Sequence, residues 1–291
     1  MRILFLVSLL VCLLVPARAQ APNPPIWQVT LFDINANVQQ AERTLSVTAT
    51  INATNVGGSP SRTLTARLNS KASVKSVAVA GAAGTFRPGA ETRGDLQRIE
   101  IALPSPASPG SSTNVTINYT LPVESNTGLS SISPIGTQFL PLAFWYPMPN
   151  TPYTVRGADS SAFRLTVNIA NVISSGVEKS GSPGSITFEQ SIHGQPFFVQ
   201  GDWDKVDGAG DGKGIAVLLE KGGSADDRKR ADALIAFAGA ARSFFAASLG
   251  PAPDVPLRIV AVRRGAGFND SGTVLIDADT LHLPKIDAAS A

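Results

Sequence analysis

Apolar and polar residues alternate along most of the first two thirds of the chain. In residues 44–56 (TLSVTATINATNV) nearly every second side chain is apolar, and the same alternation recurs in residues 97–103, 114–121 and 163–169. Weaker alternation marks residues 27–38, 62–68, 74–80, 186–190 and 197–200. Short alternating segments separated by Gly, Pro, Ser and Asn predict antiparallel strands with one buried face. We therefore expect a large antiparallel β-sandwich-like domain, or several packed sheets, over residues 20–201.

The pattern changes after Gly201. Residues 215–220 (IAVLLE) form an apolar run that predicts a strand, and a helix with marked ends follows. Ser224 stands at its N-cap position before two acids, and Gly250 ends it. The apolar stripe expected for this helix consists of Leu234, Ala238, Ala241, Phe245 and Leu249. Two further apolar strands follow, at residues 256–262 and 272–277. This order predicts an incomplete α/β unit over residues 202–291, so that the chain is mainly β and α+β overall.

The N-terminal segment has the features of a secretory signal peptide. Arg2 precedes an apolar run over residues 3–15, and Ala17-Arg18-Ala19 supplies a cleavage site of small residues. The run is too short to span a bilayer comfortably. We therefore expect a signal peptide over residues 1–19 and an exported protein, periplasmic or extracellular, without a stable membrane anchor after cleavage. A retained anchor is the alternative.

Cysteine content and charge narrow the classes of partner. The only cysteine, Cys12, lies inside the predicted signal peptide, so the mature chain is expected to hold together through its core without disulfides. The sequence has 24 lysines and arginines against 22 acids, and Arg2 and Arg18 leave with the signal peptide. The balanced charge that remains gives no reason to expect nucleic acid as a partner.

The sequence contains no motif for metal-dependent or nucleophilic catalysis. His193 and His282 are its only histidines, and neither His-Glu-x-x-His nor Gly-x-Ser-x-Gly occurs. A lone histidine is more often an ordinary surface or half-buried residue than a metal ligand. The acidic stretch 202–212 lacks the ligand spacing of an EF-hand loop. We therefore expect no catalytic residue and no metal site in this chain.

The order and character of these segments resemble the gluzincin metallopeptidases, the superfamily that includes aminopeptidase N. Residues 144–149 (FWYPMP), 163–169 (FRLTVNI) and 195–203 (QPFFVQGDW) resemble parts of its N-terminal β domain. The segments from 214–220 (GIAVLLE) to 272–277 (GTVLID) resemble the start of its thermolysin-like catalytic domain. The resemblance implies an aminopeptidase-type β domain over residues 20–201 and an incomplete catalytic domain over residues 202–291.

The stretch GAGFN resembles the Gly-Ala-Met-Glu-Asn strand that lines the substrate cleft in this family. The family's strand pairs with the peptide backbone, and its glutamate holds the free α-amino group. Gly265, Ala266 and Asn269 match that pattern, whereas Gly267 replaces the methionine and Phe268 replaces the glutamate. A carboxylate gives an ammonium group a charge-assisted hydrogen bond, but a phenyl ring gives at most a cation–π contact. The resemblance implies that these five residues bind a peptide through backbone pairing and apolar packing; a plain glycine turn is the alternative.

In this family the zinc-binding helix follows that strand, and the sequence ends at Ala291, where such a helix would begin. We therefore expect the N-terminal portion of an exported metallopeptidase-like protein that lacks the zinc site and is inactive by itself. No cofactor is expected in this chain, and zinc is expected only if the protein continues into a His-Glu-x-x-His helix. The alternative is a non-catalytic exported β module that binds peptides or protein partners. The sequence names neither a substrate nor an oligomeric state.

Overall fold

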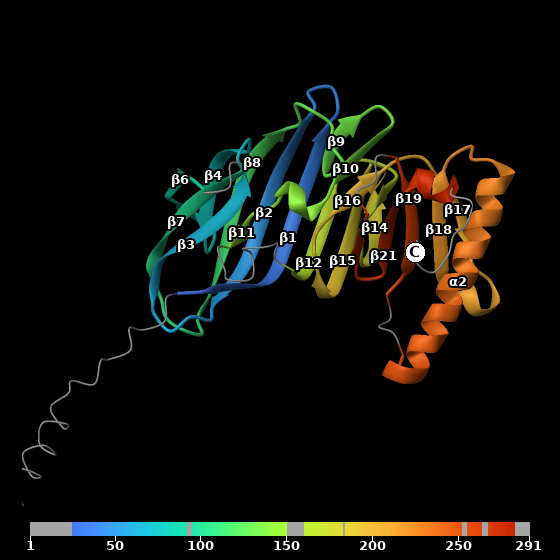
Figure 1. Cartoon of the computed structure of the whole chain (residues 1–291). Helices are drawn as coiled ribbons and strands as arrows, with labels where there is room; N and C mark the ends of the chain where they lie inside the picture. The colour runs from blue at the N-terminus through green and yellow to red at the C-terminus, as the bar shows by residue number, and fades with distance from the viewer. Residues whose placement is uncertain are drawn as a thin grey trace, which may run out of the picture.

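The computed structural model describes residues 25–91, 95–149, 160–182, 184–251, 255–263 and 267–282. The predicted signal peptide lies outside these residues, as do Gly265 and Ala266 of the predicted peptide-binding strand. The described chain forms a β-rich body at one end and a smaller unit with a long helix at the other (Figure 1).

Three sheets make up the β-rich body in the described part of the chain. We call them the main sheet, in the order β14-β15-β12-β1-β2-β8-β4-β5, the cover sheet, β11-β3-β7-β6, and the bridging sheet, β13-β16-β10-β9. The main sheet consists of β1 (Trp27–Gln39), β2 (Thr44–Asn55), β4 (Ser73–Val79), β5 (Ala82–Gly84), β8 (Ser112–Pro122), β12 (Ser161–Val167), β14 (Val177–Ser182) and β15 (Ser185–Gly194). The cover sheet consists of β3 (Ser61–Asn69), β6 (Phe86–Ala90), β7 (Leu96–Ala107) and β11 (Met148–Pro149). The bridging sheet consists of β9 (Ser130–Ser133), β10 (Gly136–Phe139), β13 (Val172–Ile173) and β16 (Phe198–Gln200).

The alternating segments of the sequence are strands, which confirms the predicted mainly β fold. In β2 the apolar positions from Leu45 to Ala53 are buried, and most of the intervening positions are partly buried. The neighbours within the main sheet are antiparallel except for β1 and β12, which run parallel from Leu31 beside Ala162 to Ala36 beside Val167. The sequence pattern did not predict this parallel pair or the short strands β9 and β10, because four-residue strands carry too little alternation to be recognised.

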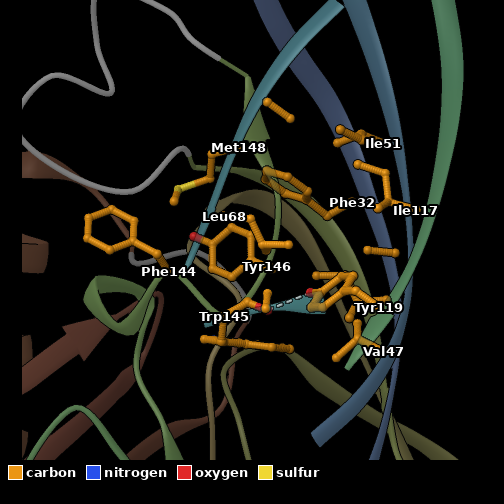
Figure 2. Packing of buried hydrophobic residues seen from close by; sticks show 14 of the residues in the cluster. Phe32, Val47, Ile51, Leu68, Ile117, Tyr119, Phe144, Trp145, Tyr146 and Met148 are labelled. Carbon is orange, nitrogen blue, oxygen red and sulfur yellow. Dashed lines mark hydrogen bonds between the residues drawn. The ribbon is translucent and has the colours of Figure 1, made fainter. Parts of the chain in front are cut away.

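The main and cover sheets pack against each other over one apolar core, as a sandwich does. Ile51 and Ile117 of the main sheet and Leu68 and Ile99 of the cover sheet are fully buried in the same cluster. Figure 2 shows the aromatic residues of the segment 145–149 filling this core beside the main sheet. The segment is therefore a buried bend, as its aromatic and proline content predicts.

Aromatic contacts fix that bend in place. Trp145 and Tyr146 lie edge to face with ring centroids 5.4 Å apart, and Tyr146 makes a similar contact with Phe32 of β1 at 5.2 Å. The Tyr119 hydroxyl donates a hydrogen bond to the carbonyl oxygen of Trp145, at 2.5 Å (Figure 2). Burial raises the pKa of Tyr119 well above its ordinary value, so the phenol remains a donor.

The second unit is a five-stranded sheet in the described residues, which we call the α/β sheet. Its order is β17-β18-β19-β21-β20, with the three central strands parallel and both edge strands antiparallel. Its strands are β17 (Trp203–Asp207), β18 (Ile215–Glu220), β19 (Leu257–Val262), β20 (Phe268–Asp270) and β21 (Thr273–Asp277). The chain changes from the bridging sheet to this sheet between Gln200 and Trp203.

Helix α2 (Ala225–Leu249) connects β18 to β19 and covers one face of the α/β sheet. Its N-terminus is closed by a capping box: the Ser224 hydroxyl accepts from the amide of Asp227, and the Asp227 carboxylate accepts from the amide of Ser224. The predicted apolar stripe is only partly correct. Leu234 is buried, but Phe245 and Leu249 are exposed, and the buried face is instead Ala231, Leu234, Ile235 and Gly239.

The length of α2 explains this correction. A helix of 25 residues extends about 37 Å, whereas a six-residue strand extends about 20 Å. The C-terminal half of α2 therefore projects beyond the strands on which its N-terminal half packs (Figure 1). By length and composition alone α2 would also be long and apolar enough to cross a membrane, a criterion that core helices of soluble proteins meet as well.

The other face of the α/β sheet packs on the β-rich body. Leu218, Val260 and Leu275 from the sheet form one buried cluster with Phe197 and Val199 from the β16 region. The α/β sheet therefore lies between α2 and the β-rich body, and the two units share an apolar junction (Figure 1).

Candidate functional site

A cleft of about 390 Å³ opens between the β-rich body and the α/β sheet. One wall is the hairpin of β9 and β10 together with the end of β16. The opposite wall is formed by the residues at the carboxyl ends of the parallel strands β18 and β19, namely Glu220, Lys221 and Ala261–Arg263. Ligands of open α/β sheets bind outside the carboxyl ends of their strands, so this cleft is the first candidate for a binding site.

The wall from the β-rich body presents polar groups. Thr137 and Gln200 pair directly across β10 and β16, and both line the cleft. The buried oxygens Oγ1 of Thr137 and Oε1 of Gln200 have no hydrogen-bond partner among the described residues. Gln138, their neighbour, donates from Nε2 to the carbonyl oxygen of Gly128. Polar groups with unused hydrogen-bonding capacity are unusual in a protein interior and are more common at binding sites.

The opposite wall carries an ion pair. Arg263 Nε lies 2.6 Å from a carboxylate oxygen of Glu220, and both side chains are about half exposed at the cleft. Trp203 also lines the cleft, and its Nε1 donates to the carbonyl oxygen of Asn171 at 3.3 Å. The cleft thus combines an aromatic ring, an ion pair and neutral polar groups, and it can bind an uncharged or zwitterionic polar ligand.

The predicted peptide-binding strand follows Arg263, a residue of this cleft, in the sequence. Gly265 and Ala266 lie outside the described residues, and the chain is next described at Gly267, which is exposed; a Cβ added to it would meet no atom within 4 Å. Phe268 and Asn269 belong to β20, which is an edge strand of the α/β sheet and pairs with β21. An edge strand leaves backbone donors and acceptors free for another strand, as peptide addition requires.

The side chains of the predicted strand face different surroundings. Phe268 is partly buried, and its ring meets Phe197 edge to face with centroids 5.0 Å apart, so it belongs to the apolar junction between the units. Asn269 is exposed. None of these three residues lines the cleft itself. Their expected contribution is therefore through the backbone of the strand, and Phe268 is placed to hold the strand against the β-rich body.

Beyond Asn269 the strand is fixed by polar contacts that the sequence did not predict. Asp270 accepts hydrogen bonds from the Ser175 hydroxyl and the Gln195 amide of the β-rich body. Burial raises the pKa of Asp270 above its ordinary value, and the hydrogen bonds from Ser175, Gln195 and Ser271 act in the opposite direction. No sequence motif marked this aspartate, or Thr137 and Gln200, because their partners lie on distant strands.

The fold and the cleft together define a class of protein. A sandwich-like β body that leads into a parallel sheet with one crossover helix and antiparallel edge strands is the fold of the N-terminal portion of M1 zinc metallopeptidases. The predicted resemblance to aminopeptidase-type proteins is therefore confirmed at the level of the fold.

Comparison with solved structures quantifies this similarity of fold. Yeast leukotriene A4 hydrolase in complex with bestatin matches with a TM-score of 0.70 and 14% identity, over 94% of this chain and 45% of that chain. An M1 zinc metallopeptidase from Deinococcus radiodurans matches with a TM-score of 0.65 and 17% identity, over 90% of this chain and 63% of that chain. The chain thus spans about half to two thirds of the length of the structures it matches. No protein-family profile and no curated protein sequence matches it.

The described residues do not suit the zinc ion that such proteins hold. They contain no group of three His, Cys, Asp or Glu side chains close enough to share a metal. His193 lies on β15 with its Nδ1 3.2 Å from the carbonyl oxygen of Ser160, and the side chain of His282 lies outside the described residues. A catalytic zinc needs three protein ligands, and these residues do not supply them.

Proposed function

We propose that this chain is the N-terminal portion of an exported M1-type zinc metallopeptidase and that its interdomain cleft binds the peptide substrate. The observation that carries the proposal is the match of 94% of the chain to less than half of yeast leukotriene A4 hydrolase. The predicted signal peptide supports export to the periplasm or the extracellular space. The zinc site and the catalytic activity would then belong to polypeptide that follows residue 291.

The exposed apolar surface of α2 supports this proposal. A groove of about 300 Å³ between α2, β19 and β21 is lined almost entirely by apolar side chains, including Phe237, Ile259 and Ile276. Thr280 and Leu281 of the last described turn, η4 (Ala278–His282), also line it. Phe244 and Leu249 extend this apolar surface to the end of the helix, where they are 69% and 81% exposed. A contiguous apolar surface of this kind suits the packing of further polypeptide.

The coding DNA beyond codon 291 tests the first part of the proposal. We expect an open reading frame that contains His-Glu-x-x-His followed by a further glutamate. A stop codon without such a sequence would reject the peptidase and leave the non-catalytic peptide-binding module as the function.

A peptide-binding measurement tests the cleft. Tyr-Ser-Ala is a suitable probe, since a Deinococcus radiodurans M1 metallopeptidase variant has been solved with this tripeptide. We expect the purified chain to bind it weakly and Gly267→Pro, which removes a backbone donor, to bind it at least several-fold more weakly. Gly267→Ala is the matched control, because an added Cβ meets no atom within 4 Å. Equal binding by the proline and alanine variants would contradict a role for this strand.

A further inference from the structure

Two segments of the β-rich body lie against the far end of the α/β sheet. Asp270 Oδ2 accepts a hydrogen bond of 2.7 Å from the Ser175 hydroxyl, and Oδ1 accepts one of 3.1 Å from the backbone amide of Gln195. The two carboxylate oxygens of one side chain thus bind two loops that are well separated in sequence. Ser271, the next residue, donates from its hydroxyl to the carbonyl oxygen of His193 at 3.0 Å.

Arg258 on β19 binds the first of these loops from the neighbouring strands. Its Nη1 donates to the carbonyl oxygens of Ser174 and Gly176, at 2.7 and 3.2 Å. Thr273, which pairs with both Arg258 and Asp270 across the sheet, also donates from its hydroxyl to the Ser174 carbonyl at 3.4 Å. Strands β19, β21 and β20 therefore all hold the same short loop.

The fit between the two units is close at these contacts. A Cβ on Gly194 would lie 2.8 Å from Asp270 Oδ2, so only glycine allows the carboxylate to approach this turn. Ser174 and Ser175 are fully buried. A carboxylate that is largely removed from water is costly unless it is hydrogen-bonded, so an apolar side chain would be the easier choice for a purely adhesive contact.

The position of these contacts connects them to the cleft. Asp270 ends β20, which runs antiparallel to β21, so β20 starts toward the carboxyl ends of the parallel strands, where residues of β18 and β19 line the cleft. The apolar junction of Phe197, Val260 and Leu275 already joins the two units. Apolar burial therefore stabilises the contact between the two units, and the directional hydrogen bonds of Asp270 fix the position of β20 within that contact.

We propose that Asp270, supported by Arg258, is a positioning residue that holds edge strand β20 at one place against the β-rich body, so that the proposed peptide-binding backbone at Gly267–Asn269 is kept in a fixed orientation. This inference rests on the proposed function for the peptide, but the position of the strand does not. Hydrogen exchange and peptide binding therefore test it separately.

Hydrogen–deuterium exchange tests the positioning directly. In Asp270→Ala we expect the amides of residues 267–277 to exchange about tenfold faster or more, because two hydrogen bonds to a charged group are lost. The fragments of β2 and β8 should be unchanged. Asp270→Asn, whose side chain can still accept from Gln195, should exchange nearly as slowly as the wild type. Asp207→Ala is the matched control: Asp207 lies on the opposite edge strand, and its side chain forms an exposed ion pair with Lys205.

Unchanged exchange at residues 267–277 in Asp270→Ala would overturn the inference. An equal increase in exchange throughout β17–β21 would also overturn it, because such an increase means general destabilisation of the unit. If Asp270→Ala does not fold, Ser175→Ala removes a single hydrogen bond and should show the same local pattern at smaller amplitude. Tyr-Ser-Ala affinity gives the second readout, and we expect it to fall in Asp270→Ala and to recover in Asp270→Asn. A wild-type chain that binds no Tyr-Ser-Ala would count against the proposed function, and the exchange pattern would still decide the role of Asp270.

Discussion

Asp270 illustrates what a buried charged side chain costs and what it provides. Its burial raises its pKa, which means that the folded chain binds this proton more tightly than the unfolded chain does. The stability linked to that proton is complete below the unfolded-state pKa of about 3.9 and is lost as the pH rises through the higher folded-state value. Above that value the ionised carboxylate is therefore held at a cost, which its hydrogen bonds partly offset.

A change of Asp270 to asparagine should make this cost visible. Asp270→Asn removes the titration and keeps an acceptor for the Gln195 amide. We expect its free energy of unfolding, relative to the wild type, to increase as the pH rises from about 4 to about 7. Urea unfolding at a series of pH values measures the difference. Both chains contain the same neighbouring side chains, Arg258, Glu178 and His193, so the difference between the two curves reports the Asp270 carboxyl. Two parallel pH curves would contradict the prediction.

Single residues of the site differ in how far the sequence could predict them. Gly267, Phe268 and Asn269 stand in a contiguous stretch that resembles a known strand, so they could be named in advance. Thr137 and Gln200 become neighbours only when β10 pairs with β16, and Asp270 meets Ser175 only when the two units pack. Contacts between distant segments leave no periodic signal in the chain, and only the folded structure identifies them.

Among the elements, α2 allows the sharpest test of local sequence chemistry. Ser224 closes its first turn through the capping box, and loss of such a cap costs about 1 kcal/mol. We expect Ser224→Ala to lower the free energy of unfolding by about this amount. Chemical denaturation of the purified chain measures it. Ser248→Ala, near the exposed C-terminal end of the same helix, should change stability by less than about 0.5 kcal/mol; equal effects would show that the cap is not the cause.

The exposed half of α2 should control association of the isolated chain. Phe244 and Phe245 are 69% and 56% exposed, with ring centroids 5.5 Å apart. We expect the chain to self-associate through this apolar surface and the double variant Phe244→Glu/Phe245→Glu to be monomeric. Light scattering after size exclusion gives the mass. Ala236→Glu/Ser243→Glu adds the same charge to the opposite exposed side of the helix, and this control should associate as the wild type does.

The sequence predicts a helix or strand well where the apolar pattern of the segment itself specifies the element. The N-cap of α2, strand β18 and the long strands of the main sheet were all found from their patterns. The buried face of α2 was predicted incorrectly in its second half, because that half of the helix projects beyond the strands on which the first half packs. The helix pattern records which residues are apolar, whereas burial depends on what lies beside them.

The molecule as a whole should not act as a zinc peptidase by itself. The described residues contain no group of three possible ligands, and the full sequence has only two histidines. Since catalytic zinc depends on three protein ligands, we expect well under one zinc per molecule by elemental analysis after dialysis against zinc. We also expect no hydrolysis of an aminoacyl test substrate. One tightly held zinc, with hydrolysis that a chelator abolishes, would contradict this prediction.

The parallel pairing of β1 with β12 bears on how the chain acquires its structure. Leu31 pairs with Ala162, so the main sheet cannot be completed until more than half of the polypeptide has been made. Pairings between such distant segments have a large loop-closure entropy, and chains dominated by them fold slowly, on the order of milliseconds to seconds. A chain that folds late stays unfolded for longer, which is compatible with the export proposed above, since exported chains commonly cross the membrane unfolded.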